Sequence, residues 1–97
     1  MIEYLREFVT PTEYDSICAV LDEKQKIEFE VMQDNVYHVL SYLAEIGVKN
    51  LGQIIIERPD LCFRSKETLI AQFSVIDQDL LIKLISENLD DLHCFGI

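Results

Sequence analysis

The side chains that most often perform catalysis or bind metal ions are few in this sequence and poorly spaced. The histidines are His38 and His93, and the cysteines are Cys18, Cys62 and Cys94. Because His93 and Cys94 are adjacent, their side chains cannot easily share one ion, and no second pair of ligands is evident. Cys18 and Cys62 stand among apolar residues, which favours core packing over a reactive thiolate. The sequence therefore predicts no metal site and no cofactor.

The carboxylates and glycines also lack a catalytic pattern. Asp77 and Asp79 form one close pair and Asp90 and Asp91 another, but neighbours along a helix point in different directions. Helix capping is a sufficient role for Asp77. The three glycines form no phosphate-binding loop. We therefore predict that the chain has no catalytic residues and is not an enzyme.

Charge is the strongest property of the sequence. Eighteen acidic residues stand against eight basic ones, for a net charge of −10. A field of this sign repels nucleic acid and anionic lipid, and it attracts basic proteins. The middle of the chain differs, because residues 47–76 hold four basic and three acidic residues. If the chain binds nucleic acid, the basic residues of this segment are the candidate phosphate contacts: Lys49, Arg58, Arg64 and Lys66.

Three hypotheses for function follow. The first is a protein–protein interaction or regulatory module without catalysis, which binds another protein, preferably a basic one, with Tyr4, Tyr37 and Tyr42 as candidate contacts. Core packing is the alternative role for these tyrosines. The second is nucleic-acid binding through the basic middle segment, which the overall charge disfavours. The third is an acidic DNA mimic that inhibits a nucleic-acid-binding protein. If a helix leaves an apolar face unpaired, a homodimer also has to be considered.

Composition and patterning predict one all-α domain over residues 1–97. Apolar residues make up 49% of the chain, and it contains only three glycines and two prolines, too few for a turn-rich β fold. No apolar run is long enough for a membrane span, and the N-terminus lacks the basic and apolar pattern of a secretion signal. We therefore expect a cytoplasmic protein that does not enter a membrane. The odd number of cysteines agrees with this expectation.

Helix signals predict a compact array of about five or six short helices, arranged as hairpins or repeats. The expected helices are residues 2–9; 11 to about 26, with a capping box at Thr10 and Glu13; 35–46, capped by Asp34 and ended by Gly47; a short helix after Asn50 that stops at Pro59; one capped by Ser65; and one capped by Asp77. Residues 27–31 alternate between apolar and acidic, as in a half-buried strand. No second strand is evident, so an extended connector or a helix fragment is the alternative, and a short hairpin with residues 62–64 also stays open.

Residues 43–69 combine a helix that ends in a glycine, a short capped helix and a proline. The residues with this pattern are Gly47, Val48, Ile54, Ile55, Pro59 and Leu61, extended by Ser65 and Leu69. The segment resembles one repeat of the mitochondrial transcription termination factor family. The resemblance implies stacked helical repeats with a basic concave face for duplex nucleic acid. It bears on the fold more than on function, since this chain is acidic. Residues 42–48 and 92–97 also echo each other, as in a weak internal repeat.

Overall fold

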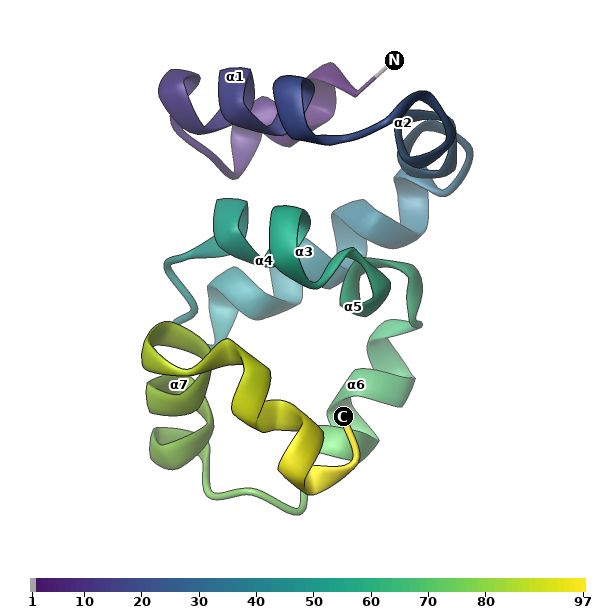
Figure 1. The fold of residues 1–97 in the computed structure, drawn as a ribbon. Helices are drawn as coiled ribbons and strands as arrows, with labels where there is room; N and C mark the ends of the chain where they lie inside the picture. Colours follow the sequence, from purple (N-terminus) through teal and green to yellow (C-terminus); the bar gives the residue numbers. More distant parts are fainter. Residues whose placement is uncertain (1) are drawn as a thin grey trace.

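Local sequence signals produce seven α-helices and two 3-10 helices in residues 2–97, the part of the chain that the computed structural model describes (Figure 1). In chain order they are η1 (Glu3–Glu7), α1 (Pro11–Val20), α2 (Glu23–Val31), α3 (Gln33–Glu45), α4 (Leu51–Glu57), α5 (Pro59–Phe63), α6 (Lys66–Phe73), α7 (Gln78–Glu87) and η2 (Leu89–Phe95). These residues contain no strand, so the all-α prediction is confirmed. The expected number of helices was too small.

The predicted caps of three helices are confirmed. At α1, the Thr10 hydroxyl accepts a hydrogen bond from the Glu13 amide at 3.2 Å, and the Glu13 carboxylate accepts one from the Thr10 amide at 2.8 Å. Ser65 caps α6 and Asp77 caps α7, each through a side-chain oxygen that accepts an amide hydrogen bond. Two other predicted caps are wrong. Asp34 lies inside the first turn of α3, and the Asn50 side chain makes no capping bond to α4.

Residues 27–31 are helical, so the interpretation as a helix fragment is confirmed, and the extended connector, the strand and the hairpin that the sequence left open are not formed. The predicted second helix also ends earlier, at Val20. Asp22 and Gln25 then form a capping box that starts α2, with the Asp22 carboxylate accepting from the Gln25 amide at 2.7 Å. Within α2, Phe29 is buried while Val31 is 78% exposed. The alternation in sequence therefore does not mark two faces of a sheet.

The helices form three successive tiers, which Figure 1 shows from top to bottom. We call η1, α1 and α2 the first tier, α3, α4 and α5 the middle tier, and α6, α7 and η2 the last tier. Packing of η1 and α2 against α3, and of α1 against α4, joins the first two tiers. Packing of α6 against α3 joins the middle and last tiers. The Asn50 side-chain amide adds a hydrogen bond between them, since it donates to the Ile85 carbonyl at 2.9 Å.

The middle and last tiers repeat the same backbone pattern thirty residues apart. Arg58, between α4 and α5, has φ −133° and ψ 58°, and Asn88, between α7 and η2, has φ −145° and ψ 69°. The amides of both residues bond to the carbonyl four residues earlier at 2.8 Å. Ile55 and Ile85 are buried at matching positions. The two tiers therefore share one local backbone pattern, a helix followed by a broken helical pair.

The echo between residues 42–48 and 92–97 has a different origin, a shared way to end a helix. Gly47 and Gly96 both have positive φ, 107° and 76°, which glycine adopts without the strain that a Cβ would cause. In each case the amide of the next residue donates a hydrogen bond to the carbonyl five residues earlier. Val48 donates to the Leu43 carbonyl at 2.9 Å, and Ile97 donates to the Leu92 carbonyl at 3.1 Å. These motifs occupy different places in the tiers, so they are not the repeated unit.

One continuous core runs through the three tiers. The side chains that are fully enclosed include Leu5, Ile17, Phe29, Val36, Val39, Leu40, Leu43, Ile54, Ile55, Leu61, Leu69, Ile85 and Leu92. The helical spacing of Ile70 on α6 and Leu80 on α7 predicts that both face the core, but they are 44% and 46% exposed. Both of them belong to the last tier. Its surface is thus more apolar than the helix pattern predicted.

Candidate functional site

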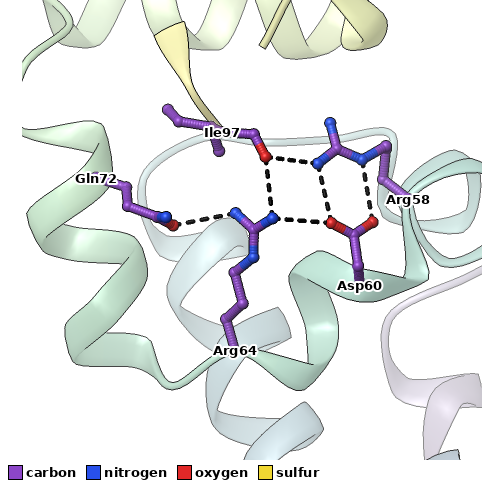
Figure 2. Close-up of polar contacts among 5 residues, drawn as sticks. All are labelled: Arg58, Asp60, Arg64, Gln72 and Ile97. Atoms are coloured by element: carbon purple, nitrogen blue, oxygen red, sulfur yellow. Dashed lines mark hydrogen bonds and ion pairs between the residues drawn. The ribbon is translucent and has the colours of Figure 1, made fainter. Parts of the chain in front are cut away.

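Two of the four cations that the sequence offered for phosphate contact point into the protein. Arg58 is 5% exposed, and its guanidinium donates two hydrogen bonds to the Asp60 carboxylate at 3.0 and 2.9 Å (Figure 2). Arg64 donates to the same carboxylate at 3.0 Å and to Gln72 at 3.1 Å. Both guanidinium groups also donate to the main-chain carbonyl of Ile97, at 2.7 and 3.0 Å. We call these five residues the arginine cluster.

The arginine cluster is a closed electrostatic unit. The pKa of Asp60 is lowered, first because its carboxylate accepts the Arg58 hydrogen bonds and then because of the two positive charges. The pKa of Arg58 is raised by the same hydrogen bonds. Within the cluster, the Arg58 Nη1 atom is buried without a hydrogen-bond partner. The cluster fastens Ile97 to the two ends of α5, and because Arg58 is buried it leaves little of that guanidinium for an outside phosphate.

The two lysines of the predicted set remain at the surface but lie apart from the arginine cluster. Lys49 is exposed in the connection between α3 and α4. The Lys66 ammonium, at the start of α6, lies 5.9 Å from the centre of the Tyr42 ring. The structure therefore brings together two of the four predicted cations, Arg58 and Arg64, and directs them inward.

The three predicted contact tyrosines have three different environments. The Tyr4 hydroxyl donates to the Phe29 carbonyl at 2.7 Å, and burial raises its pKa, so Tyr4 mainly joins η1 to α2. Tyr37 is exposed at the start of α3, and its ring meets Phe8 edge to face at 5.2 Å. Tyr42 is half-buried and stacks on Phe73 at 6.5 Å. Of the three, Tyr42 is the one that lines a hollow in the surface.

This hollow is an open, largely apolar depression in the surface of the described residues. It has a volume of about 220 Å³ and lies where α3, α6 and the start of α7 meet. Its apolar lining consists of Tyr42, Ile46, Ile70, Phe73, Ile76 and Leu81. Ser74 and Gln78 add polar groups to the wall. We call it the last-tier hollow. Such a volume is below the roughly 300–1,000 Å³ of small-molecule sites, and suits one or two apolar side chains of a macromolecule.

The residues around the last-tier hollow are apolar and acidic, except for Lys66, whose ammonium lies over the Tyr42 ring. Val75, next to lining residues in sequence, is 73% exposed, and Leu80 is exposed on α7. Glu45 precedes Ile46, and Asp77 and Asp79 stand on either side of Gln78. All three carboxylates are exposed. The sequence hinted at this site only through the excess of apolar positions on α6 and α7, because a hollow between three helices has no local motif.

The groups considered for catalysis remain separate in the folded chain. Burial raises the pKa of the Cys62 thiol to about 12, so the thiolate form is scarce near neutral pH. His38 and His93 are exposed on different helices. Among residues 2–97, no three His, Cys, Asp or Glu side chains are grouped so that they could hold a metal ion. None of the helices in this range has the length and apolar character needed to cross a membrane.

Comparisons of the chain with protein-family models, with curated proteins and with solved structures found no match. The resemblance of residues 43–69 to a termination-factor repeat therefore stays a prediction. The argument for function has to rest on the geometry of this chain alone.

Proposed function

We propose that this protein is a helical interaction module that binds another protein at the last-tier hollow. The observation on which the proposal rests is the open apolar hollow itself. Exposed apolar surface lined by a stacked aromatic pair, Tyr42 and Phe73, is the usual form of an anchor pocket for a partner side chain. Its size accommodates such an anchor better than a free ligand.

Charge supports a protein partner over nucleic acid. The last tier, residues 66–97, holds six acidic and two basic residues, and a phosphate backbone would be repelled there. The nucleic-acid alternative depends on Arg58 and Arg64, whose guanidinium groups bind Asp60 and the Ile97 carbonyl. The DNA-mimic alternative needs acidic groups spaced like phosphates, and no feature of this structure favours it over ordinary solvation. An interaction module is the function that the geometry supports best.

Site-specific photo-crosslinking tests the proposal. Ile70, at the wall of the hollow, is replaced by p-benzoyl-phenylalanine, and the purified chain is irradiated in nuclease-treated lysate from the source cell. We expect a discrete protein adduct, which then binds the unmodified chain directly when purified. The matched control carries the same amino acid at Val31, an exposed position on the first tier. Equal labelling from both positions, or a retained species that nuclease removes, would contradict the proposal.

A further inference from the structure

Residues 78–97, which contain α7 and η2, have few neighbours elsewhere in the chain. The main neighbour of α7 is η2, which follows it directly in sequence. Within residues 2–97, no other helix packs as extensively against either of these two elements. Helix α3, by contrast, packs against η1, α2, α4, α5 and α6. A segment with so few long-range contacts can open without unfolding the remainder of the protein.

Three side chains of the middle tier hold this segment through its main-chain carbonyls. The Asn50 amide donates to the Ile85 carbonyl, near the end of α7, at 2.9 Å. Arg58 and Arg64 donate to the Ile97 carbonyl, after η2, at 2.7 and 3.0 Å (Figure 2). Among residues 2–97, no other hydrogen bond joins the segment to the helices before it. The segment is therefore secured at two points by three donors.

The last-tier hollow lies where this segment meets the helices before it. Residues 74–77 connect the segment to α6 and contribute to the lining. One wall of the hollow includes Gln78 and Leu81, which belong to the segment. The opposite wall includes Tyr42 on α3 and Phe73 on α6. A movement of the segment about residues 74–77 would therefore separate the two walls.

Apolar burial makes the observed, closed arrangement the main one. The buried side chains of the segment are Leu81, Ile85, Leu89, Leu92 and Ile97, and they belong to the continuous core. Opening exposes part of this apolar surface, so the open form is a minor population. Because the three hydrogen bonds to the middle tier are broken in the same movement, their strength determines how small that population is.

We infer that residues 78–97 form a lid that opens as a unit about residues 74–77, with Asn50, Arg58 and Arg64 as its latch. The closed lid completes the last-tier hollow, and the open lid lacks one of its walls. This opening is a property of the chain alone. Its effect on binding rests on the proposed function, since an anchor that touches both walls binds only the closed form.

Hydrogen exchange of the backbone amides, followed by NMR, tests the lid in the unmodified chain. We expect the slowest amides of α7 to exchange roughly tenfold faster than those of α3, because only the lid has to open. Their exchange should also respond less to dilute urea, since lid opening exposes less surface than global unfolding does. Equal rates and equal urea dependence in α7 and α3 would mean that the chain opens only as a whole, which would overturn the lid.

Two substitutions test the latch. Arg64→Gln removes one charged donor from the Ile97 carbonyl, and it should speed exchange in the lid about tenfold. Asn50→Ala removes the donor to the Ile85 carbonyl, and it should speed this exchange about fivefold. Lys49→Ala is the control, because Lys49 is exposed and adjacent to Asn50 in sequence. Lid exchange that stays the same in both latch variants would show that these bonds do not hold the lid.

A substitution in the first tier separates lid opening from a general loss of stability. Ile17 is buried in α1, which packs on α4 of the middle tier. Ile17→Val should speed exchange in α3 roughly fivefold, because a smaller side chain lowers the stability of the whole fold. Exchange in the lid should not change, since the lid opens while the first tier stays folded. Equal acceleration in α3 and α7 would refute a separate opening of the lid.

The same measurement separates this inference from the proposed function. The protein captured by photo-crosslinking at Ile70, once purified and added at saturation, should slow exchange in the lid at least about tenfold, because it binds the closed form. A partner that binds without any change in lid exchange would refute regulation of the hollow and leave the proposed function standing. A lid that opens as expected in a chain that captures no partner would refute the proposed function and its regulation, but not the lid.

Discussion

The arginine cluster and the last-tier hollow both lie where the middle and last tiers meet, and they differ in what each leaves for an outside molecule. In the arginine cluster, Asp60 and the Ile97 carbonyl together accept five hydrogen bonds from two guanidinium groups, which closes the junction with the middle tier. The hollow, by contrast, exposes apolar side chains to water where α3 of the middle tier meets α6 and the start of α7.

The contrast shows how a stack of helices separates structural residues from binding residues. A residue type alone does not assign either role. Arg58 and Arg64 have the chemistry of phosphate contacts, yet their charges are used inside the protein. Ile70 has the chemistry of a core residue, yet it stands partly exposed. The burial and hydrogen-bond partners that the whole fold supplies distinguish these residues. The predictions below test this difference, beginning with the largest expected effect.

Removal of the Arg58 side chain should have the largest effect on stability. Arg58→Ala deletes a buried guanidinium and leaves the Ile97 carbonyl with one donor instead of two, so the free energy of unfolding should fall by about 3 kcal/mol. Urea unfolding followed by circular dichroism measures this loss. The control is Lys49→Ala at an exposed position, with an expected change within about 0.5 kcal/mol. Equal effects of the two substitutions would show that the cluster does not stabilise the junction.

Asp60 should account for a smaller, pH-dependent part of the stability. The pKa of the Asp60 carboxyl is lower in the folded protein than in the unfolded chain, where it is about 3.9. Its contribution to the free energy of unfolding is therefore fully present above the pKa of the unfolded chain. This contribution is lost as the pH falls through the lower pKa of the folded protein. At pH 7, Asp60→Asn should lower the free energy of unfolding by about 1.5 kcal/mol. Unfolding measured between pH 7 and pH 3 should show the difference from the unmodified protein shrinking below about pH 4. A constant difference would contradict this ion pairing.

The sequence predicted those parts of the fold that depend on short-range signals. The box at Thr10 and Glu13 and the caps Ser65 and Asp77 involve residues three positions apart, and all three were found from the sequence. For residues 27–31 the sequence left an extended connector, a helix fragment and a strand open, because their alternation competed with the helix-start signal at Asp22 and Gln25. Only Phe29 of that segment is fully buried, so burial did not follow the alternating pattern.

The candidate site could not be predicted in the same way, because its geometry depends on distant parts of the chain. The contact of Arg58 with Ile97 spans 39 residues, and no local spacing announces it. Tyr42 was selected as a contact, but its place in the hollow depends on Phe73 and Leu81, which other helices supply. The thirty-residue period between tiers lies mainly in backbone conformation and burial. Few residue identities repeat, so the sequence showed only the shared helix ends.

The two helix ends at Gly47 and Gly96 provide a finer test of the comparison. Each adopts positive φ, and alanine at either position should cost about 1 kcal/mol in the free energy of unfolding. Only Gly96 precedes the residue whose carbonyl enters the arginine cluster. Gly96→Ala should therefore show a non-additive effect when combined with Arg58→Ala, whereas Gly47→Ala should be additive with it. A double-mutant cycle by urea unfolding measures both couplings, and equal additivity would show that Gly96 does not position Ile97.

The smallest expected effect is on the stability of the hollow variants, and it separates a binding surface from a structural one. Ile70 and Val31 are both exposed apolar residues, so neither side chain adds much to the folded core. Ile70→Glu and Val31→Glu should each change the free energy of unfolding by less than about 0.5 kcal/mol. Thermal and urea unfolding of the two proteins measure this directly. If Ile70→Glu instead cost as much as Arg58→Ala, the hollow would be part of the core that holds the last tier. Its apolar lining would then have a structural explanation, as the arginine cluster does, and would no longer require a partner.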